Sequence, residues 1–172
     1  RSNIAWSPYG SPMENGCYRL MSLLKKSFPN YTSERDYLTN SYHYPVWNKV
    51  DALDKLDIES DFYMMSNGGN VNNIEIPNMK DNIEGYLGLV RAAYDKIQYL
   101  IVNQPIDRCF ECGFEGEFKS DGDDGFCCPD CGNNNPKTAS CIARVSGYIF
   151  DKLARPANHG KFQEITQRVK HL

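Results

Sequence analysis

Four cysteines of this chain form two pairs that have the spacing of metal ligands. Cys109 and Cys112 make one C-x-x-C pair, Cys128 and Cys131 make the other, and fifteen residues separate the pairs. A glycine follows each pair, and glycine permits the positive φ that a tight turn needs. Two such turns can direct four sulfurs to one ion in a tetrahedral arrangement. The spacing predicts a structural zinc site, with a redox dithiol or an iron–sulfur cluster as the alternatives.

The residues around these cysteines favour a structural role for the site. Cys127 adjoins Cys128 and could replace it as a ligand, but the C-P-x-C-G sequence favours Cys128. A site closed by four thiolates leaves no open position for catalysis. Between Cys109 and Asn135 there are seven acidic residues and one basic residue, Lys119. Phosphates would be repelled by this face, so we expect no nucleic acid partner.

A second candidate for chemistry is Gly147, which interrupts the apolar run CIARVSGYIF at residues 141–150. Glycine inside an extended element packs no side chain and costs conformational entropy. Considered alone, such a glycine is most simply explained as a bulge in a strand. The alternative is that its bare Cα is itself required for chemistry.

Composition and charge narrow the class of protein. The 172 residues are 41% hydrophobic and 24% charged, and the net charge of −3 gives no reason to expect a polyanionic partner. No run reaches the roughly 18 apolar residues of a membrane span, so we expect no membrane association. Seven cysteines, an odd number, favour metal ligation in a reducing cytoplasm over a disulfide framework. Because no Met opens the chain, we expect it to be a piece of a longer polypeptide.

The elements that must position these residues alternate between helix and strand. SPMENGCYRLMSLLKKSFP begins with a Ser11–Glu14 capping box and predicts a first helix, which Pro29 ends. A second capping box, at residues 81–84, precedes apolar residues at helical spacing that continue to Ile101. Such alternation predicts an α/β protein. The other expected elements are a short helix at 51–60, strands at 62–65, 74–76 and 144–150, and a closing helix at about 161–172.

The segment RVSGY, which contains Arg144, Gly147 and Tyr148, resembles the radical-site signature of glycyl radical enzymes. The C-terminal RPANHGKFQEITQRVKHL resembles the same family. A four-cysteine ribbon just before the radical loop is the mark of one branch, the anaerobic (class III) ribonucleoside-triphosphate reductases. Upstream, RDYLTNSYHYPV, DKLDIES, NVNNIEI and NQPIDRC also resemble this branch, most closely its T-even bacteriophage members. Phe150 departs from the family, which usually has a small residue at that position.

The resemblance implies that the chain is the C-terminal portion of the reductase large subunit. Residues 1–106 would form the C-terminal part of a ten-stranded α/β barrel, residues 107–135 the zinc ribbon, and residues 136–172 the glycyl radical loop and closing helix. The full enzyme would be a homodimer. It would work in the cytoplasm, which is the host cytoplasm if a phage encodes it.

The implied activity is anaerobic reduction of ribonucleoside triphosphates to deoxyribonucleoside triphosphates, with formate as the reductant. An activase that uses an iron–sulfur cluster and S-adenosylmethionine would remove a hydrogen atom from Gly147. The radical would pass to a cysteine in an N-terminal portion of the reductase, and that thiyl would abstract the ribose 3′ hydrogen. Glycine suits this role because a planar Cα radical is delocalised over the adjacent amide nitrogen and carbonyl, and a side chain would crowd it.

The resemblance also identifies weaker candidates. SPYGSPMENG resembles a segment that lines the substrate pocket of this branch, so Tyr9 and Glu14 could assist proton movement at the ribose hydroxyls. The capping box alone would also explain Glu14. Cys17 does not match the family's thiyl position, and we expect it in the core or lining the pocket. His43 is expected in the core and His171 on the surface.

Two other functions remain open from the sequence. One is a stand-alone radical-carrying spare part, like the small proteins that repair oxygen-damaged glycyl radical lyases. The zinc ribbon and the long upstream match argue against it. The other is a non-catalytic zinc-ribbon binding module, and RVSGY together with the acidic ribbon argues against that.

Overall fold

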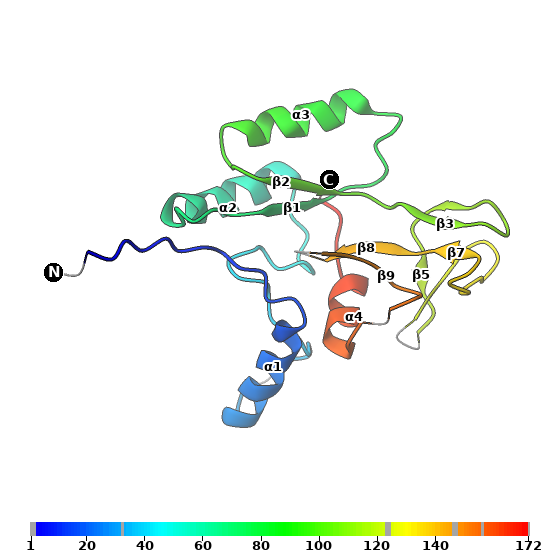
Figure 1. Ribbon diagram of the computed structural model, residues 1–172, viewed down its shortest axis with the longest axis horizontal. Coiled ribbons are helices and arrows are strands. Elements are labelled where there is room, and N and C mark those ends of the chain that lie inside the picture. Colours follow the sequence, from blue (N-terminus) through cyan, green and yellow to red (C-terminus); the bar gives the residue numbers. More distant parts are fainter. Residues whose placement is uncertain (1–2, 32, 123–124, 146–147, 156, 172) are drawn as a thin grey trace. The chain divides into compact units, whose positions relative to one another are not determined.

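The computed structural model describes residues 3–31, 33–122, 125–145, 148–155 and 157–171. The described residues form helices and short strands, so the chain is mixed α/β, as the sequence predicts (Figure 1). In chain order the elements are α1 (Gly16–Ser27), α2 (Ala52–Met65), β1 (Asn72–Glu75), α3 (Ile83–Tyr94), β2 (Leu100–Asn103), β3 (Asp107–Cys109), β4 (Glu115–Gly116), β5 (Lys119–Ser120), β6 (Phe126–Cys127), β7 (Ala139–Ser140), β8 (Ile142–Val145), β9 (Tyr148–Asp151) and α4 (His159–Thr166). The expected alternation holds only for β1, α3 and β2, because the later strands of the described residues follow one another without intervening helices.

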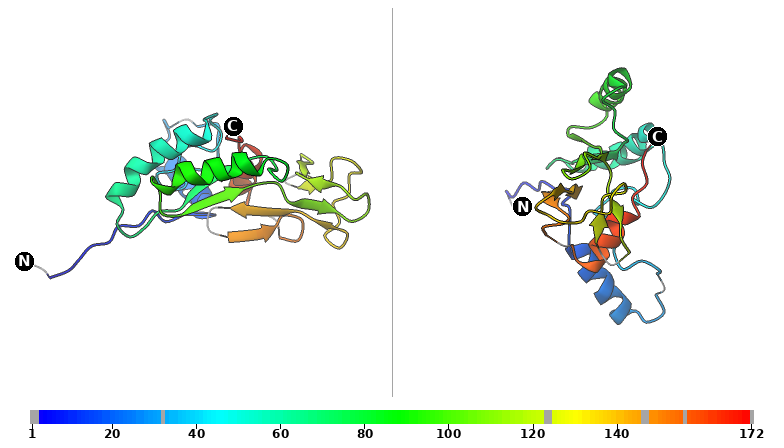
Figure 2. Two further views of the ribbon diagram at one scale, coloured as in Figure 1. Left: turned by 90° about the horizontal axis from the view of Figure 1, so that it is seen from above. Right: turned by 90° about the vertical axis from the view of Figure 1, so that its right-hand side faces the viewer.

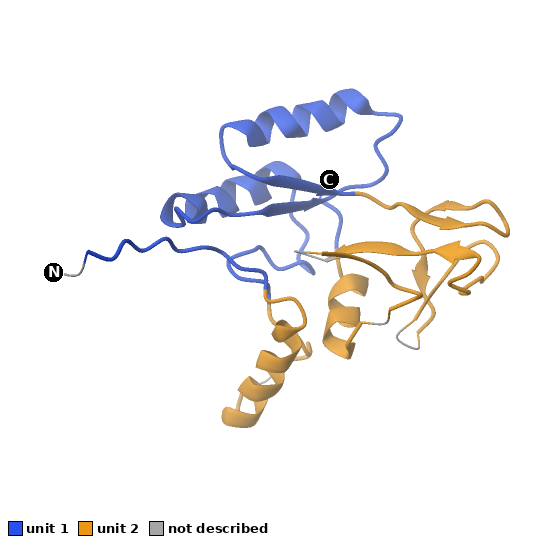
Figure 3. Cartoon of the chain, in the orientation of Figure 1, with its two compact units in different colours: residues 1–12, 39–103, 169–172 blue, residues 13–38, 104–168 orange. Residues whose placement is uncertain are grey.

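The chain divides into two compact units (Figure 3). Unit 1 comprises residues 1–12, 39–103 and 169–172, and unit 2 comprises residues 13–38 and 104–168. Each unit is therefore assembled from segments that lie far apart in the sequence. The domain boundaries expected from the sequence, after residues 106 and 135, stay a prediction.

Unit 1 is organised around two parallel strands. β1 pairs with β2, with Asn72 opposite Leu100 and Glu75 opposite Asn103. Parallel neighbours need a crossover connection, and α3 provides it (Figure 1). α2 packs against β1 and α3. The core of the unit consists of buried apolar side chains on or beside these elements: Leu56, Ile74, Ile76, Ala93 and Ile97.

Both helix starts predicted from capping boxes are wrong. α1 begins at Gly16 because Glu14 has a φ of 48°, so the backbone does not follow a helical path from Ser11. α3 begins after Asn82, whose side-chain oxygen accepts a hydrogen bond from the N–H of Gly85 at 3.0 Å. Asparagine is among the strongest N-cap residues, and it displaces the start expected from the box.

The strand predicted at residues 62–65 is also wrong, because α2 continues through it. Asp51 caps this helix by accepting a hydrogen bond from the N–H of Leu53 at 2.8 Å. No glycine or proline then interrupts the sequence before Ser66. Without such a stop signal the helix extends through an aromatic run that in isolation resembles a strand.

Two predicted helices are shorter than expected. α3 ends at Tyr94, and Ile101, which shares its apolar spacing, lies in β2. α4 ends at Thr166, and His171 then runs beside β1. The N–H of His171 donates to the carbonyl of Glu75 at 2.8 Å, and its Nδ1 accepts from the N–H of Glu75 at 2.9 Å. His171 is 3% exposed, so its predicted place on the surface is wrong.

The described residues of unit 2 form three small antiparallel sheets, in the strand orders β4-β3-β7, β5-β6 and β8-β9. In place of the single strand predicted at residues 144–150, the structure has two antiparallel strands, β8 and β9 (Figure 2). Ile142 lies opposite Asp151 and Val145 opposite Tyr148. α1 packs against α4 in the same unit. Strands this short contribute little stability by themselves, so the unit depends on other interactions.

A buried carboxylate, Glu59 of α2, connects separate segments of unit 1. Its Oε1 accepts hydrogen bonds from Lys55 and from the N–H of Tyr44 at 2.8 Å, and its Oε2 accepts one from Asn72 at 2.6 Å. His43 lies 3.2 Å from Oε2 and is largely buried, as predicted. Burial raises the pKa of Glu59, but the hydrogen bond with His43 and the charge of Lys55 outweigh it and lower the pKa from 4.5 to about 2.

This lowered pKa predicts an acid-dependent loss of stability. Because the folded pKa lies below the unfolded value, the stabilising contribution of Glu59 is complete above pH 4.5 and is lost as the pH falls toward about 2. We expect the free energy of unfolding, measured by denaturant titration, to fall less steeply over this range in Glu59→Gln than in the wild type. Equal slopes in the two proteins would show that Glu59 does not carry the effect.

Candidate metal centre

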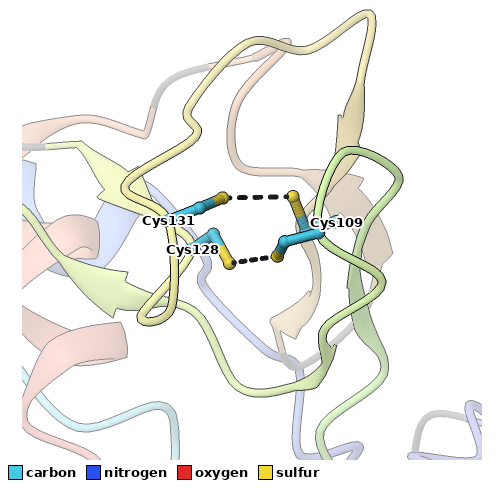
Figure 4. Close-up of side chains that lie close together, drawn as sticks. Cys109, Cys128 and Cys131 are labelled. Atoms are coloured by element: carbon cyan, nitrogen blue, oxygen red, sulfur yellow. Dashed lines mark hydrogen bonds between the residues drawn. The ribbon is translucent and has the colours of Figure 1, made fainter.

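The four cysteines selected by their spacing converge in unit 2 (Figure 4). Their Sγ atoms all lie within 4.8 Å of one another. The Sγ–Sγ distance is 3.6 Å between Cys109 and Cys131 and 3.5 Å between Cys112 and Cys128. Four thiolates at the zinc–sulfur bond length stand about 3.8 Å apart in a tetrahedron. The cluster can therefore hold a metal ion in a closed four-sulfur site, as the spacing predicts.

Both C-x-x-C pairs adopt the same turn. The N–H of Gly113 donates to the carbonyl of Cys109 at 3.0 Å, and the N–H of Gly132 donates to that of Cys128 at 2.9 Å. The φ angles of these glycines are 80° and 74°, a backbone region that strongly favours glycine. In each turn the N–H of the first cysteine also donates to the carbonyl five residues later, at 2.9 Å. The repeated geometry explains why each pair is followed by glycine.

Asn133 supports the sulfur cluster from outside. Its Nδ2 lies 3.4 Å from the Sγ of Cys109 and donates to the Oγ1 of Thr138 at 3.0 Å. Thr138 in turn donates to Glu111 at 2.8 Å. Hydrogen bonds from the backbone N–H of Cys112 and from Asn133 lower the pKa of Cys109 to about 6. Because the thiolate is the form that ligates a metal, these donors favour the ligating form of Cys109.

The metal centre shares one hydrophobic core with the helix that ends the unit. Phe126 of β6 and Phe162 of α4 have ring centroids 5.3 Å apart. Leu153 and Ile165 pack against the same core. This packing connects the sulfur cluster to α4, which supports the structural role expected for the four-cysteine site. The buried members of the core are Cys109, Phe118, Phe126, Cys128, Ala139, Cys141 and Phe162.

A buried ion pair that no sequence motif predicts also connects the end of β9 to β3, the strand that contains Cys109. Lys152, directly after β9, has its Nζ 3.3 Å from the Oδ2 of Asp107 in β3 and 4.4 Å from the centroid of the Phe126 ring. The same carboxylate oxygen accepts the N–H of Phe118 at 2.8 Å, and the N–H of Lys152 donates to the carbonyl of Cys141 at 2.7 Å. No motif relates residues this far apart, so no sequence signal pointed to this pair.

The proposed radical residue, Gly147, lies outside the described residues. The strands that flank it are described, and they pair with Val145 opposite Tyr148 and Arg144 opposite Ile149. β8 and β9 belong to the same unit as the sulfur cluster. The described part of the chain therefore joins the metal centre to both strands next to Gly147.

The weaker site candidates, Glu14, Tyr9 and Cys17, differ in their exposure to solvent. Glu14 belongs to unit 2, and its side chain is 19% exposed. Tyr9 belongs to unit 1 and is 51% exposed, beside Pro8, whose carbonyl accepts the N–H of Gly68 at 2.8 Å. Cys17 is buried, as predicted, and burial raises its pKa to about 11. A protonated, enclosed thiol is consistent with a packing role for Cys17.

Comparison with known proteins identifies the family. The family model for anaerobic ribonucleoside-triphosphate reductase matches residues 1–171, and the chain belongs to this family. It is 41% identical to the anaerobic ribonucleoside-triphosphate reductase of Haemophilus influenzae, 40% identical to that of Escherichia coli and 34% identical to that of bacteriophage T4. The phage relationship predicted from the sequence is thus confirmed, although the two bacterial enzymes are more similar.

These alignments cover 99% of this chain but only 24% of the two bacterial relatives and 28% of the phage relative. The chain therefore spans about a quarter of the length of the curated relatives it matches. Among the described residues, no helix combines the length and the apolar character that crossing a membrane requires.

The geometry of the sulfur cluster makes a direct prediction for metal binding. Cys112→Ser replaces one of four thiolates and should reduce the metal bound after zinc loading well below one equivalent per chain, as measured by elemental analysis. Cys127→Ser is the matched control, because Cys127 adjoins a ligand but is not part of the cluster. It should retain the full equivalent. Full binding by Cys112→Ser, or loss in Cys127→Ser, would show that the ligand set is different.

Proposed function

We propose that this chain is the C-terminal portion of an anaerobic ribonucleotide reductase large subunit and supplies its radical glycine and a structural zinc site. Family membership supports the activity, and the RVSGY motif supports Gly147 as the radical residue. The observation that carries the proposal is the common core of unit 2. The sulfur cluster, the end of β9 and α4 pack together, so a bound metal would fix the strand that follows Gly147 in the sequence.

Zinc is the metal that best fits the site. Soft thiolates in a tetrahedral arrangement suit an ion that has no redox chemistry and no geometric preference of its own. An iron–sulfur cluster distributes its cysteines over several irons, whereas these four sulfurs are close enough to share one ion. Cys109, Cys112, Cys128 and Cys131 would hold the zinc, which would stabilise the fold and take no part in the reaction.

The proposed reaction begins at Gly147. A separate activase, with an iron–sulfur cluster and S-adenosylmethionine, removes one hydrogen atom from the Cα of Gly147. The remaining radical is delocalised over the neighbouring amide and carbonyl, which requires a planar Cα without a side chain. The protein contributes position and exclusion of solvent, while the radical carries the chemistry.

The rest of the proposed enzyme lies in the part of the relatives that this chain does not cover. A cysteine there receives the radical as a thiyl and abstracts the 3′ hydrogen of a ribonucleoside triphosphate. Loss of the 2′ hydroxyl as water follows, and formate supplies two electrons as it is oxidised to carbon dioxide. The C-terminal part of a ten-stranded barrel, formed by residues 1–106, would enclose this chemistry in a homodimeric, cytoplasmic enzyme.

Glu14 is the stronger of the two candidates for proton movement at the ribose hydroxyls. Its φ of 48° is uncommon for a residue with a side chain, and such conformations concentrate at functional sites. The capping box that offered a purely structural explanation does not form. Tyr9, which is half exposed within unit 1, remains a proposal from the family resemblance alone.

The two other functions considered from the sequence receive less support. A radical-carrying spare part would match relatives mainly around the radical motif, but the family match extends to residue 1, far upstream of the cysteines. A zinc-ribbon binding module would not require the buried connections between the ribbon, β9 and α4.

Gly147→Ala tests the radical site in the full-length enzyme. Anaerobic activation of the wild type should give an electron paramagnetic resonance doublet, because one α hydrogen remains on the radical carbon. The alanine variant should lose both the doublet and turnover, since its methyl group crowds the planar centre. Air should then cut the activated wild type at Gly147, giving a fragment of residues 148–172 under denaturing conditions. A doublet that survives in Gly147→Ala would contradict the assignment.

Glu14→Gln tests the proton-transfer role. The amide keeps the shape of the side chain but cannot exchange a proton, so kcat should fall on the order of 100-fold, the lower range for a general acid or base. The radical yield and the zinc content should be unchanged. Glu84→Gln, at an exposed position in the first turn of α3, is the control and should retain wild-type kcat. Wild-type turnover in Glu14→Gln would remove Glu14 from the mechanism.

A further inference from the structure

A buried network of charges lies on one face of α4 in unit 2. Glu164 is 2% exposed, and its two carboxylate oxygens have different partners. Oε2 accepts a hydrogen bond from Lys161, and Oε1 accepts one from Arg168 at 2.9 Å. The spacings of three and four residues bring these side chains together along the helix and its end.

Each cation of the network reaches one of the elements assigned a role in the proposed reaction. Lys161, whose side chain is 1% exposed, has its Nζ 3.9 Å from the Oε2 of Glu14. Arg168 donates from its second guanidinium nitrogen to the backbone carbonyl of Arg144 at 2.9 Å. Arg144 belongs to β8, three residues before Gly147. Glu164 is therefore the common partner of two cations, one directed to Glu14 and one to the strand that leads to Gly147.

The geometry of β8 explains why its carbonyl needs an external donor. Along an antiparallel pair, backbone groups alternate between facing the partner strand and facing away from it. Among the described strands β8 pairs only with β9, so its other edge has no strand to supply donors. Arg168 provides such a donor, and its planar guanidinium can bond Glu164 and Arg144 at the same time.

The energetics favour a positioning role over a stabilising one. Burying two cations and their carboxylates carries a desolvation cost that their attraction often fails to exceed, so such networks are poor sources of stability. Burial raises the pKa of Glu164, but Arg168 and Lys161 outweigh it and hold the pKa below its usual range. The carboxylate therefore stays ionised and keeps both cations oriented.

We propose that Glu164 is a positioning residue that, through Lys161 and Arg168, holds Glu14 and the strand before Gly147 in fixed relation to α4. Phe162, next to Lys161 in the sequence, packs into the core of the sulfur cluster, so this relation is also fixed to the metal centre. The inference rests on the proposed function for the roles of Glu14 and Gly147, and on the described contacts for the network itself.

The first test uses the full-length enzyme before activation, so that it does not depend on radical chemistry. Glu164→Gln keeps the shape of the side chain but removes the charge shared by Lys161 and Arg168. Amide hydrogen exchange of peptides covering β8 and β9 should be at least tenfold faster than in the wild type, while zinc content and exchange in the β5-β6 sheet stay unchanged. Glu34→Gln, an exposed position in the same unit, is the matched control and should behave as the wild type.

Arg168→Lys provides a second variant in case Glu164→Gln does not fold. Lysine keeps the positive charge but cannot bond Glu164 and the Arg144 carbonyl together, so exchange in β8 should again accelerate. After activation, both variants should show at least a tenfold lower kcat with an unchanged KM for the nucleotide, because substrate binding is not altered. A residue that only stabilised the fold would not lower kcat while leaving KM unchanged.

The outcomes separate this inference from the proposed function. Exchange in β8 and β9 that matches the Glu34→Gln control in both variants would overturn the positioning role, whatever the radical signal. A wild type that gives no radical doublet would overturn the proposed function, while the exchange comparison would still test the network. Faster exchange with equal losses in kcat and in substrate binding would also count against positioning.

Discussion

The convergence of four sulfurs on one point is the constraint on which unit 2 depends. Strands of two to four residues cannot hold a fold by themselves, and the aromatic core beside the cysteines is small. Two turns of the same geometry, each completed by a glycine at positive φ, position the two cysteines of each pair, and the fold of the intervening fifteen residues brings the pairs together. Structural zinc contributes on the order of 10 kcal/mol to the folding of small ribbons, so a metal bound at this cluster would stabilise the unit strongly.

Side-chain contacts connect the sulfur cluster to α4 and to the two strands on either side of Gly147 in the sequence. Phe162 carries α4 into the core of the ribbon, and the ion pair between Lys152 and Asp107 fixes the end of β9. Arg168, which is held by Glu164, then donates to the carbonyl of Arg144 on β8. The three connections are aromatic packing, an ion pair and a hydrogen bond to the backbone. Each joins elements that are not adjacent in the sequence.

Features that depend on residues close together in the sequence were the ones that could be predicted. The spacing of the cysteines and the glycine after each pair define the sulfur cluster completely, because one turn determines each half of it. The capping boxes fail because Glu14 adopts a left-handed conformation and Asn82 is the better cap. Glu164 contacts Lys161 and Arg168 at local helical spacing, but these two cations reach Glu14 and Arg144, which only the tertiary fold brings near them. For the same reason no periodicity could indicate that His171 lies beside β1.

The hydrophobic core shared by the ribbon and α4 has a consequence for molecules whose chain has been cut at Gly147. Oxygen acting on a radical at Gly147 would break the chain between β8 and β9, yet the released segment would still pair with β8 and bury Phe162 against the ribbon. A nicked molecule would therefore keep its native size and its metal, and only a denaturant would reveal the break. It would also occupy the place that any replacement segment needs, so exchange of the broken piece would require the ribbon core to open first.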